Sequence, residues 1–342
     1  MNSKTIFVRY LIFLCGFFLA SRFYLPAHYN IPYPAPLVFQ FSPDIKKEHL
    51  KAIEQSRPEL VLVGDSVLER GVDADLLSAR SGVKSYAIYV PGSGTASWYL
   101  VMKNIILKSA EPPKYIAIVF RNTMLTVPQY RTTGRYQELL DDYASKNEPL
   151  LMELAFISQM NPIEKFSQQY IPLYSARLKI REELDSFLRY LPTSTMLGCD
   201  RECTNDAIKS TFGREVDLMA LTQMMEDAAK TLYDPEEMNF ERQVADSFLP
   251  YMIQLAQENN VNLIFIRTGI VGYEPPALEK YTKSLDAYLS KQDHVFLINF
   301  DHDPRIKKEF YYNDGLHFNE YGKAEFTKML ADELIKVVKD NR

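Results

Sequence analysis

The distribution of apolar residues along the chain predicts a buried parallel sheet. Short, almost uninterrupted apolar runs occupy residues 59–63, 83–90, 115–120, 262–268 and 295–300. Such runs are typical of strands that are covered on both faces. Helical periodicity occupies the stretches between several of these runs, and the last stretch, 320–339, is amphipathic. Because strands that alternate with helices indicate a parallel sheet between two helical layers, the pattern predicts an α/β fold.

One stretch interrupts this alternation. Residues 123–260 connect the third predicted strand to the fourth. This connection is far longer than an ordinary crossover. The stretch is rich in Leu, Met, Glu and Tyr, and helical spacing recurs within it at 138–145, 162–191 and 215–230. We therefore expect a mainly helical insertion at 123–260, within a domain that spans residues 46–342.

The N-terminal residues have the pattern of a membrane segment. Lys4 and Arg9 precede an apolar run from Tyr10 to Ala20, which approaches the length of a short span when it is extended back through Ile6. Cleavage after Ala20 would place Phe18 where signal peptidases need a small residue. The pattern favours an uncleaved signal-anchor over residues 1–24, with a cleaved signal peptide as the alternative.

Both interpretations place the rest of the chain outside the cytoplasm. We expect a Pro-rich, extended linker over residues 25–45, followed by a domain outside the cytoplasm. Cys199 and Cys203 stand four residues apart with no histidine nearby, which disfavours zinc. In an oxidising compartment they are candidates for a local disulfide, and two free surface thiols are the alternative.

Composition narrows the possible partners. The formal charge is −5, from 39 Lys and Arg against 44 Asp and Glu, so there is no basic excess to neutralise nucleic-acid phosphates. The chain has five histidines and three cysteines, too few for most metal sites. We expect neither a nucleic-acid partner nor a metal or organic cofactor.

Polar residues follow the predicted strands. The first strand runs into Gly64-Asp65-Ser66, the second into Ser93-Gly94, and the third into Asn122, while Asp314 and His317 precede the last helix. Ligands of parallel sheets bind outside the carboxyl ends of the strands, so these groups are expected to converge. Together they supply a nucleophile, oxyanion donors and an acid–base pair, as serine chemistry requires.

These four motifs, in this order and at these strand ends, resemble the SGNH (GDSL-like) hydrolase superfamily. The resemblance covers about residues 55–122 and 260–340. Two positions depart from the family pattern, since Val67 follows the serine in place of Leu, and the third block reads Arg121-Asn122-Thr123 in place of Gly-x-Asn-Asp. The resemblance implies a flavodoxin-like three-layer α/β/α sandwich with a parallel five-stranded sheet.

The resemblance also implies roles for individual residues. Ser66, Asp314 and His317 match the catalytic residues of the family. The oxyanion hole corresponds to the backbone N–H groups of Ser66 and Gly94 and the side chain of Asn122. Gly64 and Asp65 are expected to support the nucleophile turn structurally.

Each motif also has a purely structural interpretation. The hydroxyl of Ser66 is suited to capping the helix after the first strand. A turn-forming or surface position is the corresponding alternative for Asn122, Asp314 and His317.

The expected activity is ester hydrolysis or O-acyl transfer. Exported, membrane-anchored proteins that resemble this chain add or remove acyl groups on envelope polysaccharides. This implies an acylated glycan or another ester as substrate, a location on the periplasmic side of the inner membrane, and an acyl-donor membrane protein as partner. Two alternatives stay open: a glycan-binding or assembly module that is catalytically weak, and a lipid esterase.

Overall fold

The computed structural model describes residues 3–37, 47–133, 136–206, 238–269, 276–312 and 314–340. The chain forms two compact units. One consists of Met1–Phe39 and Ile157–Glu226, and the other of Gln40–Phe156 and Asp227–Arg342. We call the second the sheet unit and the first the anchor unit.

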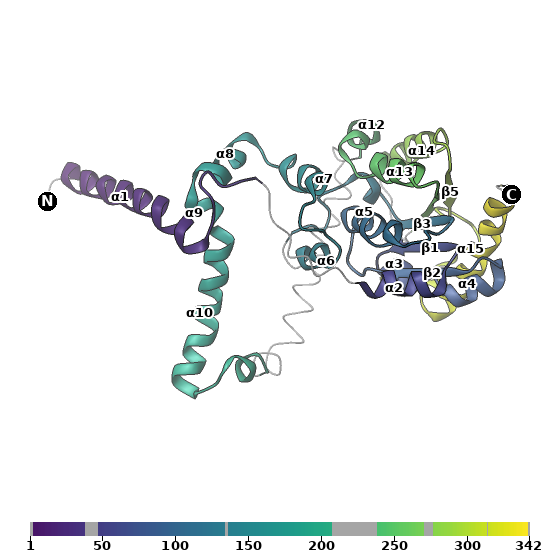
Figure 1. Ribbon diagram of the computed structural model, residues 1–342, viewed down its shortest axis with the longest axis horizontal. Coiled ribbons are helices and arrows are strands. Elements are labelled where there is room, and N and C mark those ends of the chain that lie inside the picture. Colours follow the sequence, from purple (N-terminus) through teal and green to yellow (C-terminus); the bar gives the residue numbers. More distant parts are fainter. Residues whose placement is uncertain are drawn as a thin grey trace. The chain divides into compact units, whose positions relative to one another are not determined.

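A five-stranded parallel sheet forms the centre of the sheet unit (Figure 1). Its strands are β1 (Leu60–Gly64), β2 (Ser85–Tyr89), β3 (Tyr115–Phe120), β4 (Asn262–Arg267) and β5 (Val295–Asn299). Their order is β2-β1-β3-β4-β5, so the chain reverses its direction of travel across the sheet between β1 and β3. The predicted α/β class, the five parallel strands and the flavodoxin-like order are confirmed.

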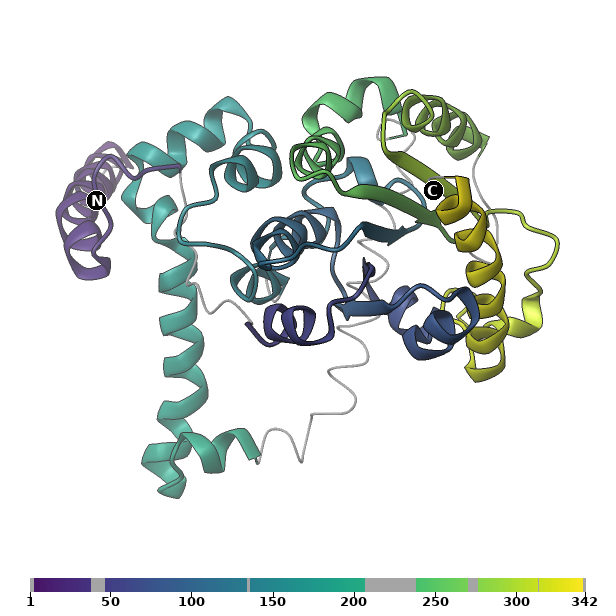
Figure 2. The same cartoon turned by 45° about the vertical axis from the view of Figure 1, so that its right-hand side comes forward.

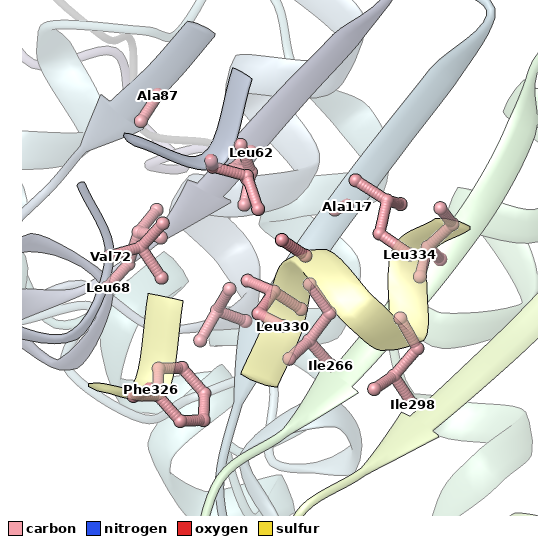
Figure 3. Packing of buried hydrophobic residues seen from close by; sticks show 14 of the residues in the cluster. Leu62, Leu68, Val72, Ala87, Ala117, Ile266, Ile298, Phe326, Leu330 and Leu334 are labelled. Atoms are coloured by element: carbon pink, nitrogen blue, oxygen red, sulfur yellow. The ribbon is translucent and has the colours of Figure 1, made fainter. Parts of the chain in front are cut away.

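One face of the sheet is covered by the helices that follow β1 and by the last helix. These are α3 (Ser66–Gly71), α4 (Ala74–Ser81) and α15 (Glu320–Asp340). Figure 3 shows Phe326, Leu330 and Leu334 of α15 among strand residues that point toward them. All three of these side chains are buried, so this layer holds α15 against the sheet and against α3.

The opposite face is covered by a second helical layer (Figure 2). It contains α5 (Thr95–Asn104), α13 (Leu249–Glu258) and α14 (Pro276–Leu289), which contact β1, β4 and β5 respectively. Nine of the ten residues of α5 are buried, including the single tryptophan, Trp98. With the sheet between them, the two helical layers form the three-layer arrangement that the alternation of strands and helices predicted.

Shorter elements complete the sheet unit. The α-helices are α2 (Lys47–Ser56), α6 (Gln137–Asp141), α7 (Pro149–Met152) and α12 (Phe240–Gln243). The 3-10 segments are Ile106–Lys108, Met124–Thr126, Val244–Asp246 and Lys308–Phe310, and Glu153–Ile157 is a π-helix.

The range predicted as one insertion, 123–260, is divided between the two units. Its first part, to residue 156, and its last part, which contains α12 and α13, belong to the sheet unit. Within this range, α13 packs on β4 as a crossover helix of the sheet. The predicted helix at 215–230 lies outside the described residues.

The described part of the anchor unit is mainly helical. Its helices are α1 (Ser3–Tyr29), α8 (Pro162–Tyr170), α9 (Pro172–Ser175) and α10 (Arg177–Leu197), and residues 201–206 are helical as well. The Tyr29 hydroxyl, at the end of α1, lies 2.6 Å from a carboxylate oxygen of Glu183. The Lys179 ammonium donates to the Tyr29 carbonyl at 3.0 Å. A disulfide joins Cys199 and Cys203.

Helix α1 is long and apolar enough to cross a membrane between Thr5 and Tyr29, and most of it is exposed. A signal sequence has the same length and composition. The helix continues to Tyr29, so the first residues of the range predicted as linker, 25–45, are helical. Residues 38–45 of that range lie outside the described part of the chain.

Candidate active site

The predicted nucleophile lies where β1 passes into α3. The strand ends at Gly64, and Ser66 is the first residue of the helix. Asp65 caps α3, since its carboxylate accepts the N–H of Val67 at 2.9 Å. With Asp65 serving as the cap, the half-buried Ser66 has its hydroxyl available for another partner.

That partner is His317, although 251 residues separate the two in sequence. The Ser66 Oγ lies 2.8 Å from His317 Nε2, and the His317 Nδ1 lies 2.7 Å from Asp314 Oδ2. The other carboxylate oxygen of Asp314 accepts the backbone N–H groups of Leu316 and His317, at 2.9 and 3.0 Å. These bonds fix the carboxylate, and a carboxylate at Nδ1 favours the tautomer that leaves Nε2 free to accept a proton.

The electrostatic surroundings keep Asp314 ionised. Partial burial raises the pKa of its carboxyl, but hydrogen bonds from the His317 side chain and from two backbone N–H groups outweigh that effect. The pKa of Asp314 is therefore lowered from its ordinary value. A carboxylate in this state can stabilise a positive charge on the imidazole of His317.

Phe318 holds the loop that carries His317 against α3. Its ring stacks between those of Tyr311 and Phe326, with centroids 4.6 and 4.7 Å away. It also lies so close to Gly71, the last residue of α3, that a Cβ there would be 3.0 Å from the Phe318 ring. Since Phe318 directly follows His317 and Gly71 ends the helix that Ser66 begins, this packing sets the distance between the two catalytic candidates.

Polar contacts reinforce the same junction. Lys323 of α15 donates its ammonium to the Glu69 carbonyl in α3 at 2.9 Å. Thr327, one turn further along α15, accepts the backbone N–H of Asp73 at 3.0 Å. The last helix is thus attached to both ends of the segment that follows Ser66.

The predicted oxyanion residues lie at the ends of the two strands that flank β1. Gly94 is the N-cap of α5, at the end of β2, where the helix exposes its first N–H groups. Asn122 follows β3, is buried, and has a left-handed backbone with a φ of 47°. Ser66 and Asn122 therefore border the reversal point between β1 and β3, the usual ligand position in this class of sheet.

Arg121, which departs from the family pattern, has a partner that the sequence did not indicate. Its guanidinium lies 3.4 Å from the Asp65 carboxylate, and both side chains are more than nine-tenths buried. It also contacts the sulfur of Met124 at 3.0 Å. The charge of Arg121 thus compensates that of the carboxylate that caps α3, and the pair links the ends of β1 and β3 beside Ser66.

The segment after Asn122 packs against the turn that carries Gly94. A Cβ at Gly94 would be 2.9 Å from both the ring and the carbonyl oxygen of Tyr130, so this approach requires glycine. Tyr130, Tyr136 and Tyr143 of this segment are all buried, so they offer no surface to a ligand. Phe166 and Tyr170 are exposed but belong to the anchor unit, as does the Cys199–Cys203 disulfide.

No cluster of three or more metal-ligating side chains occurs in the part of the chain that the structure describes.

The buried pair of Arg121 and Asp65 is expected to be essential for stability. Arg121→Met would leave the Asp65 carboxylate buried without its cation, which typically costs about 3–5 kcal/mol. The change in the free energy of unfolding is measured by titrating the detergent-solubilised chain with urea and monitoring its circular dichroism. Arg80→Met is the matched control: it removes an exposed guanidinium from its pair with Asp332 and should cost less than about 1 kcal/mol. Equal unfolding midpoints for Arg121→Met and Arg80→Met would contradict this interpretation of the buried pair.

Comparisons with known proteins gave matches among solved structures only. No family model matches the sequence, and no curated protein does. One similar structure is the "putative acylhydrolase" of Bacteroides fragilis NCTC 9343, at 10% identity and a TM-score of 0.39, with 82% of this chain and 86% of that chain covered. Another is a GDSL-like lipase of Bacteroides thetaiotaomicron VPI-5482, at 10% identity and a TM-score of 0.38, with 86% and 98% covered. The chain's own strand order confirms, at the level of the fold, the resemblance that its motifs indicated.

Proposed function

We propose that the chain is a serine-dependent ester hydrolase or O-acyltransferase with Ser66 as its nucleophile. The observation that carries this proposal is the continuous hydrogen-bonded series from Ser66 through His317 to Asp314. A helix-capping role for Ser66 is not needed, because Asp65 already fills it. A surface role for His317 does not account for two side-chain partners, one on each ring nitrogen.

In the proposed reaction, Ser66 Oγ attacks the carbonyl carbon of an ester while its proton passes to His317 Nε2. Asp314 holds the imidazole and stabilises the imidazolium that forms. Collapse of the tetrahedral intermediate breaks the ester C–O bond, and His317 returns the proton to the departing alcohol. Water or a sugar hydroxyl then attacks the acyl-serine by the same steps, which restores Ser66.

The developing oxyanion would be held by the N–H groups of Ser66 and Gly94 and by the Asn122 side chain. One such donor typically stabilises the transition state by about 3–4 kcal/mol. The left-handed backbone of Asn122 and its burial beside β3 fit a side chain that has to occupy one defined position.

The proposed substrate is an acylated glycan of the cell envelope, and the proposed location is the outer face of the membrane that α1 crosses. The length and apolar composition of α1 support the tether. A membrane-bound acyl donor would supply the acyl group in the transferase form of the reaction. Hydrolysis of lipid esters and glycan binding without catalysis are outcomes that the experiments below distinguish.

Removing any one of the three catalytic groups should abolish most turnover. We expect Ser66→Ala, His317→Ala and Asp314→Asn each to lower kcat for para-nitrophenyl acetate by several orders of magnitude. The double variants should lose little more than the single ones, because the groups act as a unit. Asn122→Ala should cost about 10²–10³-fold, the usual loss for one oxyanion donor. Circular dichroism of each variant controls for folding.

Retention of activity by Ser66→Ala would exclude the serine mechanism. An effect confined to Ser66 and His317, with full activity in Asn122→Ala, would instead move the oxyanion role to another donor.

A glycan acceptor should compete with water for the acyl-enzyme. A site that orients a sugar hydroxyl gains from proximity, so transfer should exceed hydrolysis at modest acceptor concentrations. The measurement supplies an acetyl donor with and without oligosaccharides and compares acetylated sugar with free acetate. Release of acetate from acetylated glycans without transfer would identify an esterase. Rapid cleavage of long-chain lipid esters, with no activity on glycans, would contradict the glycan assignment.

A further inference from the structure

Arg131 is a cation beside the candidate site that has no anionic partner among the described residues. The residue is half-buried, and its Nε is fully buried without a hydrogen-bond acceptor in the described part of the chain. Its guanidinium lies over the rings of Tyr130 and Tyr136, 4.9 and 5.4 Å from their centroids. A half-buried guanidinium with no carboxylate beside it in the described part of the chain is suited to binding an anion that comes from outside.

The two tyrosines place that charge at the turn after β2. The Tyr130 ring and carbonyl lie at Gly94, where a Cβ would be 2.9 Å away. The Tyr136 ring lies at Gly92, where a Cβ would be 3.2 Å away. The two rings that Arg131 lies over therefore also contact the turn that carries the proposed oxyanion donor, Gly94.

Arg121 shows what a structural arginine looks like in this site. It follows the neighbouring strand β3 and is paired with the Asp65 carboxylate. Arg131 has no such carboxylate, and its backbone is left-handed, with a φ of 55°, which is unfavourable for a residue with a side chain. A strained backbone that holds an uncompensated guanidinium beside a candidate oxyanion turn is typical of a ligand-binding position.

We propose that Arg131 binds an anionic group of the substrate, a carboxylate or phosphate, adjacent to the ester that Ser66 attacks. This inference rests on the proposed esterase function and narrows its substrate to acidic molecules. A guanidinium that stacks on aromatic rings keeps its in-plane N–H groups free, and their geometry matches two oxygens of one carboxylate or phosphate. In a glycan, such a group would belong to the acylated sugar or to the next one.

The test uses three acetate esters that differ only in the group remote from the reacting bond. They are para-acetoxyphenylacetate, para-acetoxyphenyl phosphate and the neutral para-acetoxyphenylacetamide. For the full-length wild type in detergent, kcat/KM should be about 10- to 100-fold higher for at least one anionic ester than for the amide. The carboxylate and phosphate members of the set decide which anion the site prefers.

Three substitutions assign that preference to Arg131. Arg131→Gln should remove the preference for the anionic ester while it changes kcat/KM for the amide less than about threefold. Arg131→Lys, which keeps the charge but loses the planar fork, should retain part of the preference. Arg80→Gln removes an equal charge from an exposed pair with Asp332 and should leave the preference intact.

A binding measurement separates this inference from the proposed function. Ser66→Ala cannot form the acyl-enzyme, so calorimetric titration of that variant with the same three esters reports binding alone. Tighter binding of an anionic ester than of the amide, lost on adding Arg131→Gln, supports the anion site even if the wild type turns over none of the esters. Equal affinities and equal kcat/KM values for all three esters, or a preference that survives Arg131→Gln, would overturn it.

Discussion

The packing of Phe318 against Gly71 is the constraint on which the candidate active site depends. It joins the loop that carries His317 to the helix that begins at Ser66, and these two segments are far apart in the sequence. Stacking of Phe318 on Tyr311 and Phe326 makes this junction part of the hydrophobic core. Because protein cores are close-packed and relax little, a contact made there fixes the position of the imidazole with little freedom.

The parallel sheet also determines how the charged groups of the site are paired. Three strand ends bring several polar groups into a small volume, and most of them are paired within it: Asp65 with Arg121, and Asp314 with His317. These pairings leave the Ser66 hydroxyl facing the imidazole of His317, and leave Arg131 as a cation with no carboxylate partner among the described residues. An ester with an acidic neighbour would satisfy both features at once, with its carbonyl at Ser66 and its anion at Arg131.

The sequence was informative where local pattern determines structure. The uninterrupted apolar runs of β1, β3 and β4 identified buried parallel strands, and the parallel arrangement alone implied that Ser66 and Asn122 lie at one edge. The pairing of Arg121 with Asp65 depends instead on the register between β1 and β3. The two residues are 56 positions apart in the sequence, so no local pattern indicates that they meet. The packing of Tyr130 against Gly94 likewise depends on the path of the chain after β3, which the sequence pattern does not determine. The division of 123–260 between two units was hidden because helices of both units share the same amphipathic spacing.

The central claim is that Ser66 is an activated nucleophile, and covalent labelling tests it most directly. A fluorophosphonate probe reacts with a serine hydroxyl only when a neighbouring base accepts its proton. Incubation of the full-length chain with such a probe, followed by peptide mass spectrometry, should place one adduct on Ser66. The adduct should be lost in His317→Ala, in which the serine is intact but its base is gone. Absence of labelling at Ser66 in the folded wild type, or equal labelling in His317→Ala, would contradict the account.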